Sequence, residues 1–155
     1  MRALIFDLDG TLIDSVYAHV FGWQKSFAAE GMQVPACSIH AKIGLGGREL
    51  ALAIGRELGK HVSKDEADSL DQRHGTIMRG LLPRAEPLPG AAALLRRLRD
   101  MNIPWGIATS GDRPGVDQAL RSLGLPPDEA TVICKSDVEH AKPKPDLFLA
   151  CWRES

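Results

Sequence analysis

The stretch LIFDLDGTLIDS, residues 4–15, changes within a few positions from an apolar run to an acidic turn that contains a glycine. Its first residues have the composition of a short buried strand, and Asp7 and Asp9 stand where that strand ends. Side chains two positions apart on a strand point to the same side. Both carboxylates are therefore expected to face one pocket at the carboxyl end of the strand.

Two neighbouring carboxylates need a physical reason to lie together. A tight turn uses Asp and Gly readily, but one Asp is enough for it, and a second carboxylate adds repulsion unless a cation or a proton relieves it. The pattern therefore favours a nucleophilic carboxylate and an acid/base partner with a hard cation between them. Its spacing excludes an EF-hand, because Gly10 follows Asp7 too closely to be the glycine of a calcium loop.

The bulk composition indicates a globular protein of ordinary size. The chain has 155 residues, of which 44% are hydrophobic and 25% charged, and its net charge is −1. This charge gives no electrostatic reason to expect nucleic acid or an anionic membrane as partner. Three cysteines without metal-ligand spacing indicate neither a disulfide framework nor a zinc site. With no charged-then-apolar leader and no apolar span, the predicted location is the cytoplasm.

Apolar spacing along the chain predicts an α/β fold. Strands are expected at 4–6, 103–108 and 131–134, and helices at 14–31, 38–43, 48–58, 63–82, 90–101, 116–123 and from 146 onward. Strands that alternate with helices indicate a parallel sheet with crossover helices. The helical residues 15–85 interrupt this alternation, so we expect a core of residues 1–14 plus 86–155 with an inserted helical cap. The proline-rich residues 83–89 would be a stiff connector.

Two further segments carry polar groups that suit an anion. Thr109, Ser110 and Gly111 end the second strand, so their hydroxyls and amides should lie at the same sheet edge as Asp7 and form an anion nest. On its own this turn is equally well an ordinary strand-end turn. Lys142 lies in HAKPKPD, residues 140–146, where a lone lysine would usually be solvated.

In combination the segments DLDGTLIDS, ATSG and KPKPDLFL resemble three signatures of the haloacid dehalogenase-like hydrolase superfamily, in its phosphoglycolate phosphatase and β-phosphoglucomutase branch. The resemblance implies a Rossmann-like core in which Asp7 attacks phosphorus and Asp9 handles the proton of the leaving group. It also implies that Thr109 holds a phosphate oxygen and that Lys142 balances the charge. Because true dehalogenases lack the second acid, Asp9 favours phosphoryl transfer over dehalogenation.

The same resemblance extends to the substrate and the cofactor. It implies Mg²⁺ at Asp7 and Asp9, and further contacts to phosphate or substrate from Gly10, Thr11, Ser110, Gly111 and Arg48. Arg48 follows a glycine-rich loop, residues 44–47, that is equally well a plain turn between helices. His19, His40, His61 and His74 show no metal-ligand spacing and are expected at the surface.

The family's fourth signature, an acidic pair on a further strand that completes the magnesium site, is not found after Lys142. We therefore expect a sheet that is incomplete at its C-terminal side, with residues 4–6 as an apolar edge open to self-association. The principal hypothesis is a Mg²⁺-dependent phosphatase of a small phosphorylated metabolite, such as phosphoglycolate or a sugar phosphate, acting through an aspartyl-phosphate, with weak or no activity in these 155 residues alone. The alternatives are a phosphomutase, or a non-catalytic remnant that binds phosphate or a protein partner.

Overall fold

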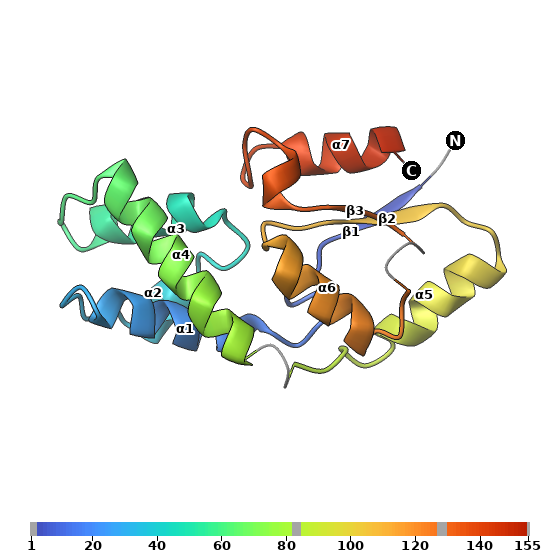
Figure 1. Cartoon of the computed structure of the whole chain (residues 1–155), viewed down its shortest axis with the longest axis horizontal. Helices are drawn as coiled ribbons and strands as arrows, with labels where there is room; N and C mark the ends of the chain where they lie inside the picture. Colours follow the sequence, from blue (N-terminus) through green and yellow to red (C-terminus); the bar gives the residue numbers. More distant parts are fainter. Residues whose placement is uncertain (1–2, 82–84, 127–129, 155) are drawn as a thin grey trace.

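The computed structural model describes residues 3–81, 85–126 and 130–154, and Figure 1 shows their arrangement. In chain order the elements are β1 (Leu4–Phe6), α1 (Val16–Ala28), α2 (Ala36–His40), α3 (Gly47–Glu57), α4 (Lys64–Leu81), α5 (Ala91–Asp100), β2 (Trp105–Ala108), α6 (Arg113–Ser122), β3 (Thr131–Ile133), the short 3₁₀ helix η2 (Lys135–Asp137) and α7 (Asp146–Glu154). The described residues thus follow the predicted alternation of strands and helices.

The three strands form one parallel sheet in the order β1-β2-β3. Ile5 pairs with Gly106 and Ile107 pairs with Val132, so β2 is the central strand, and all four of its residues are buried. The predicted α/β fold with parallel strands is confirmed. Within the described residues β1 is an edge strand, and the side chain of Leu4 is 44% exposed. Self-association through this edge stays a prediction.

Side chains of β2 alternate between the two faces of the sheet, as the pleat of a strand requires. Trp105 and Ile107 belong to the larger core cluster, which includes Leu95 of α5 and Leu120 of α6. Ala108 belongs to a smaller cluster with Ile133 of β3 and with Leu147 and Cys151 of α7. Helix α7 therefore covers one face, and α5 and α6 cover the other (Figure 1).

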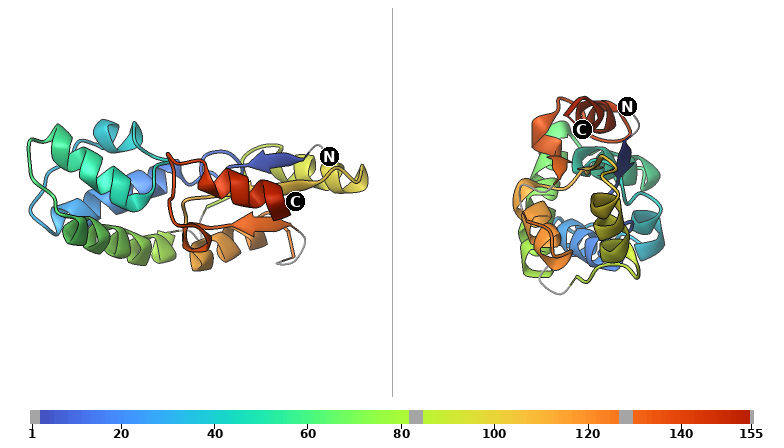
Figure 2. Two further views of the ribbon diagram at one scale, coloured as in Figure 1. Left: turned by 90° about the horizontal axis from the view of Figure 1, so that it is seen from above. Right: turned by 90° about the vertical axis from the view of Figure 1, so that its right-hand side faces the viewer.

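Helices α1–α4 gather at one end of the molecule, beyond the carboxyl ends of the strands (Figure 2). They have a hydrophobic cluster of their own, in which Trp23 and Phe27 of α1 contact the same core as Ile54 of α3 and Leu70 of α4. The predicted helical cap is confirmed. Its limits at residues 15 and 85 stay predictions, and residues 82–84 of the expected proline-rich connector lie outside the described residues. No helix among the described residues is long and apolar enough to cross a membrane.

Among the predicted boundaries that shift, two have a clear local reason. Strand β2 begins at Trp105 and not at residue 103, because Pro104 lacks an N–H group and only its carbonyl oxygen is used, by the N–H of Leu4 at 3.0 Å. Helix α6 begins three residues earlier than predicted. Asp112 is its N-cap, and its Oδ1 accepts a hydrogen bond from the Gly115 N–H at 3.0 Å.

Three large apolar side chains of the predicted helical segments lie at the surface. Phe21 is 47% exposed, Leu94 43% and Met101 52%. Phe21 and Leu94 stand beside Val20 and Leu95, which do enter the core. The apolar stripe of each helix is wider than the face that its neighbours cover, so the outer members of the stripe stay in contact with water.

Replacing Ser63 by Ala should lower the free energy of unfolding by about 1 kcal/mol. Ser63 Oγ accepts from the Glu66 N–H at 3.2 Å and Glu66 Oε2 accepts from the Ser63 N–H at 2.7 Å, so the two residues form a capping box at the start of α4. Chemical denaturation measures the change. Ser69→Ala, at an exposed position in the middle of the same helix, is the control, and an equal loss in both variants would contradict the role of the cap.

Candidate active site

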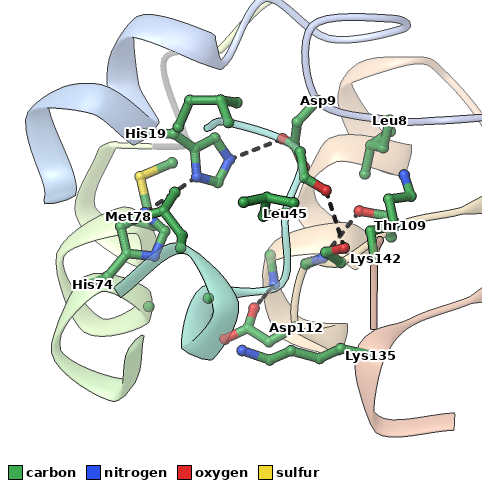
Figure 3. Close-up of a pocket in the computed structure, with 18 of the residues that line it drawn as sticks. Leu8, Asp9, His19, Leu45, His74, Met78, Thr109, Asp112, Lys135 and Lys142 are labelled. Carbon is green, nitrogen blue, oxygen red and sulfur yellow. Dashed lines mark hydrogen bonds and ion pairs between the residues drawn. The ribbon is translucent and has the colours of Figure 1, made fainter. Parts of the chain in front are cut away.

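A pocket lies where the carboxyl ends of β1 and β2 meet the cap, and Figure 3 shows its lining. Asp7 and Asp9 follow β1, and Thr109, Ser110 and Gly111 follow β2; all five line the pocket. Lys142, from the loop before α7, lines it too. The structure thus brings together residues that the sequence places more than a hundred positions apart.

Asp7 is held by a cation and by the backbone N–H of the next residue. Its Oδ1 accepts a hydrogen bond from Lys142 Nζ at 2.6 Å and another from the Leu8 N–H at 2.8 Å. The Lys142 side chain is only 12% exposed, and its ammonium group also lies 5.0 Å from the centre of the Phe148 ring. Lys144 is exposed. Lys142, by contrast, is not the solvated lysine of the alternative interpretation, and its charge is directed at the candidate nucleophile Asp7.

Asp9 has a different set of partners. Its Oδ1 accepts from Ser15 Oγ at 2.6 Å and from His19 Nε2 at 3.0 Å. Burial by itself raises the pKa of Asp9, but the hydrogen bond and charge of His19, the Ser15 hydroxyl and the charge of Lys142 together hold that pKa below its ordinary value. Ser15 occupies the N-cap position of α1, yet its hydroxyl binds Asp9 and does not cap the helix.

The expectation of surface histidines is wrong for two of the four. His74 is 7% exposed and stacks on Trp23 with ring centres 4.3 Å apart. Its Nε2 lies 3.2 Å from Nδ1 of His19, so Asp9, His19 and His74 form one chain of hydrogen bonds (Figure 3). Burial, followed by the charge of His19, holds the pKa of His74 well below its ordinary value. The position of His19 near Asp9 could have been predicted from the sequence, because His19 follows Ser15 by four positions and both therefore lie on one helix face.

Thr109 and its neighbours form a compact turn. Thr109 is 1% exposed, and its Oγ1 accepts from the Gly111 N–H at 3.0 Å. Ser110 Oγ donates to the carbonyl oxygen of Gly44 at 3.5 Å, so this turn of the core contacts the glycine-rich loop of the cap. The hydroxyl and amides of the turn lie at the pocket edge, where an anion would meet them.

Three of the predicted contact residues do not line the pocket. Gly10 and Thr11 are exposed in the turn after β1. Gly10 has a φ of 74°, and a Cβ there would lie 2.6 Å from Val16 Cγ2, so the position requires glycine for the chain reversal. Arg48 points away: its guanidinium donates to both carboxylate oxygens of Asp68, at 2.6 and 2.7 Å. The loop before it does reach the pocket, through Ile43, Gly44, Leu45 and Gly47.

Charged and polar contacts join the cap to the core around the pocket. Lys135 Nζ lies 2.8 Å from Asp71 Oδ2 of α4, and Arg79 Nη1 of the same helix lies 3.6 Å from Asp112 Oδ2. The Gly46 N–H donates to the carbonyl oxygen of Lys142 at 2.8 Å. These contacts hold the cap over the two carboxylates.

The pocket contains the carboxylate oxygens that a hard cation such as Mg²⁺ prefers as ligands. Mg²⁺ is bound in many proteins by one or two carboxylates, with water and substrate phosphate completing its shell. Asp7 and Asp9 supply two carboxylates in one pocket. Among the described residues, no group of three or more His, Cys, Asp or Glu side chains is gathered to hold a metal. The site therefore fits a cation that also binds substrate or water, and does not resemble an all-protein cage.

Comparison with protein families matches residues 1–155 to the haloacid dehalogenase-like hydrolases. The chain belongs to this family. Hexitol phosphatase A of Escherichia coli K12 is 32% identical to it over 156 residues, which cover 96% of this chain and 66% of that protein. β-Phosphoglucomutase of Bacillus subtilis is 29% identical over 156 residues, covering 96% of this chain and 67% of that protein. The chain spans about two thirds of the length of these curated relatives.

A solved structure confirms the fold. The crystal structure of a hydrolase from Pseudomonas syringae superposes with a TM-score of 0.94 at 36% sequence identity, covering 99% of this chain and 70% of that one. The predicted haloacid dehalogenase-like core with an inserted helical cap is therefore confirmed both by the chain's own packing and by this neighbour.

Acid should destabilise the protein through His74. The pKa of His74 lies below the ordinary value of 6.5, so the unfolded chain takes up the proton first as pH falls. The stability that the buried neutral His74 contributes is fully present above about pH 6.5. Below that pH the free energy of unfolding falls by at most about 1.4 kcal/mol per pH unit. Denaturant titrations at pH 7.5 and 5.5 should show a smaller acid loss in His74→Gln than in wild type. His61→Gln, at an exposed position, should lose as much stability in acid as wild type does. Equal losses in all three proteins would show that His74 is not the source of the acid sensitivity.

Proposed function

We propose that this family member is a Mg²⁺-dependent phosphatase that hydrolyses a small phosphate monoester through an aspartyl-phosphate on Asp7. The observation that carries the proposal is the contact of Lys142 with Asp7 at 2.6 Å, with Asp9 and Thr109 lining the same pocket. The named phosphatases among the relatives support phosphoryl transfer to water. They do not fix the substrate of this chain.

In the first step a carboxylate oxygen of Asp7 attacks phosphorus in line, and the bond from phosphorus to the ester oxygen breaks. Asp9 gives a proton to the departing oxygen, so an alcohol leaves and Asp7 carries the phosphoryl group. The lowered pKa of Asp9 makes it a carboxylate at neutral pH before substrate binds, so it has to gain a proton first. His19 Nε2, at 3.0 Å, is positioned to supply one.

In the second step a water molecule attacks the phosphorus of the aspartyl-phosphate. Asp9, now ionised, takes a proton from that water, the bond from phosphorus to Asp7 breaks, and inorganic phosphate leaves. Thr109 and Lys142 bind the phosphoryl oxygens as charge develops on them. The cap, which we place at residues 15–85, limits the access of bulk water to the pocket.

Mg²⁺ held by Asp7 and Asp9 would neutralise phosphate charge and let the Asp7 carboxylate approach the phosphate. Removal of divalent cations with EDTA should therefore abolish turnover of p-nitrophenyl phosphate, and added Mg²⁺ should restore it. Equal concentrations of Na⁺ are the control for ionic strength. Full activity in EDTA would contradict the proposed cofactor.

Replacing Asp7 by Asn should lower kcat by about 10⁴-fold or more, because an amide cannot form the covalent intermediate. Asp14→Asn, at an exposed acid seven residues further along, is the matched control and should keep wild-type activity. Release of inorganic phosphate from p-nitrophenyl phosphate measures both variants. Retained hydrolysis in Asp7→Asn would overturn the mechanism, and absence of turnover in wild type would favour the non-catalytic alternative.

A phosphomutase is the second candidate, because β-phosphoglucomutase of B. subtilis is among the relatives. It would use the same four residues, which are Asp7, Asp9, Thr109 and Lys142. It would pass the phosphoryl group to a sugar hydroxyl instead of water. Incubation with a hexose phosphate distinguishes the two, since a phosphatase releases inorganic phosphate whereas a mutase forms an isomeric sugar phosphate.

A further inference from the structure

The charges that line the pocket point to the class of alcohol that the substrate carries. Among the described residues, the lining contains four carboxylates and two ammonium groups: Asp7, Asp9, Asp71 and Asp112, with Lys135 and Lys142. The Mg²⁺ proposed at Asp7 and Asp9 would neutralise the reacting phosphate there. On the cap side, Asp71 and Lys135 therefore decide whether a further negative charge on the substrate can be placed.

Each cation at the pocket is already paired with an acid. Lys142 contacts Asp7 beside the reacting phosphate, and Lys135 contacts Asp71 at 2.8 Å on the cap side. Arg79, next to the pocket, faces Asp112 at 3.6 Å. In the proposed mechanism Lys142 binds the reacting phosphate, so it cannot also bind a second anionic group. A second anionic group would have to draw Lys135 from Asp71, and this would leave the Asp71 carboxylate beside it.

Arg48 does not supply another cation. It is the residue that the family resemblance suggested for an anionic substrate group, but both of its hydrogen bonds go to Asp68 outside the pocket lining. Asp71 is fixed close to the glycine-rich loop, because a Cβ on Gly47 would overlap its carboxylate. The cap side of the pocket therefore presents a carboxylate and an ammonium group to the substrate as a neutral, hydrogen-bonding pair.

We infer that the alcohol part of the substrate is uncharged and rich in hydroxyl groups, and that Asp71 discriminates against esters with a second anionic group. This inference rests on the proposed phosphatase function. Hydroxyl groups can donate to Asp71 and accept from Lys135 without breaking the pair. A carboxylate or a second phosphate in the same place would face Asp71 at short range, and such like-charge contacts reduce affinity strongly. Phosphoglycolate and sugar bisphosphates are therefore poor substrates, and a polyol or sugar monophosphate is a good one.

Two esters that differ only in the charge at one carbon test this inference. Sorbitol 6-phosphate and 6-phosphogluconate share a six-carbon skeleton, but the second ends in a carboxylate. We expect wild type to have a kcat/KM for sorbitol 6-phosphate at least about tenfold above that for 6-phosphogluconate. Asp71→Asn should reduce this ratio several-fold, and Lys135→Gln, which leaves Asp71 unpaired, should increase it. Asp65→Asn, on the exposed side of the same helix, should leave the ratio unchanged.

Opposite shifts in the two variants would distinguish a charge effect from general damage to the pocket. A wild type that prefers 6-phosphogluconate, or an Asp71→Asn variant with an unaltered ratio, would overturn the inference. Dissociation constants of the two esters, measured by calorimetry on an Asp7→Asn background, separate this result from failure of the proposed function. Selectivity would appear there in binding even if wild type hydrolysed neither ester, and equal constants would refute the inference while turnover persisted.

Discussion

The contact between Lys142 and Asp7 is the interaction on which the site depends, because it joins the two ends of the core at the place where negative charge accumulates. Two carboxylates in one pocket repel each other, and an ammonium group at 2.6 Å offsets that repulsion. The position of Lys142 depends in turn on α7, whose Leu147 and Cys151 are fully buried against the sheet. Packing on one face of the sheet therefore fixes a charge at its carboxyl edge.

The cap is coupled to the same loop. The Gly46 N–H binds the carbonyl oxygen of Lys142, so movement of the cap would disturb the backbone that carries the cation. A side chain on Gly46 would lie 2.9 Å from the Cβ of Ala141, which explains why this part of the cap loop is glycine. For the glycine-rich loop, residues 44–47, the sequence allowed either a plain turn or a substrate contact. In the structure it is a point where the backbones of cap and core approach closely.

The residues that sequence reasoning correctly placed at one sheet edge share one physical property. Asp7, Asp9 and Thr109 directly follow strands, and in a parallel sheet the carboxyl ends of strands meet at one edge, so local pattern was sufficient to bring them together. The residues it missed come from the cap or face it. His74 and Asp71 reach the pocket only because α4 docks over the core, and no local pattern encodes that docking. Arg48 fails for the same reason, since its partner Asp68 lies on the neighbouring helix.

The different partners of the two carboxylates support the two different chemical roles that we propose for them. Asp7 accepts a hydrogen bond from the ammonium group of Lys142, and its carboxylate is the one that we propose as the nucleophile. Asp9 faces an imidazole, the side chain that exchanges a proton most readily near neutrality. His74 extends this chain into the interior, and its own low pKa keeps it uncharged beside His19. This difference in environment between two neighbouring acids supports the proposed assignment of Asp7 to attack and of Asp9 to proton transfer.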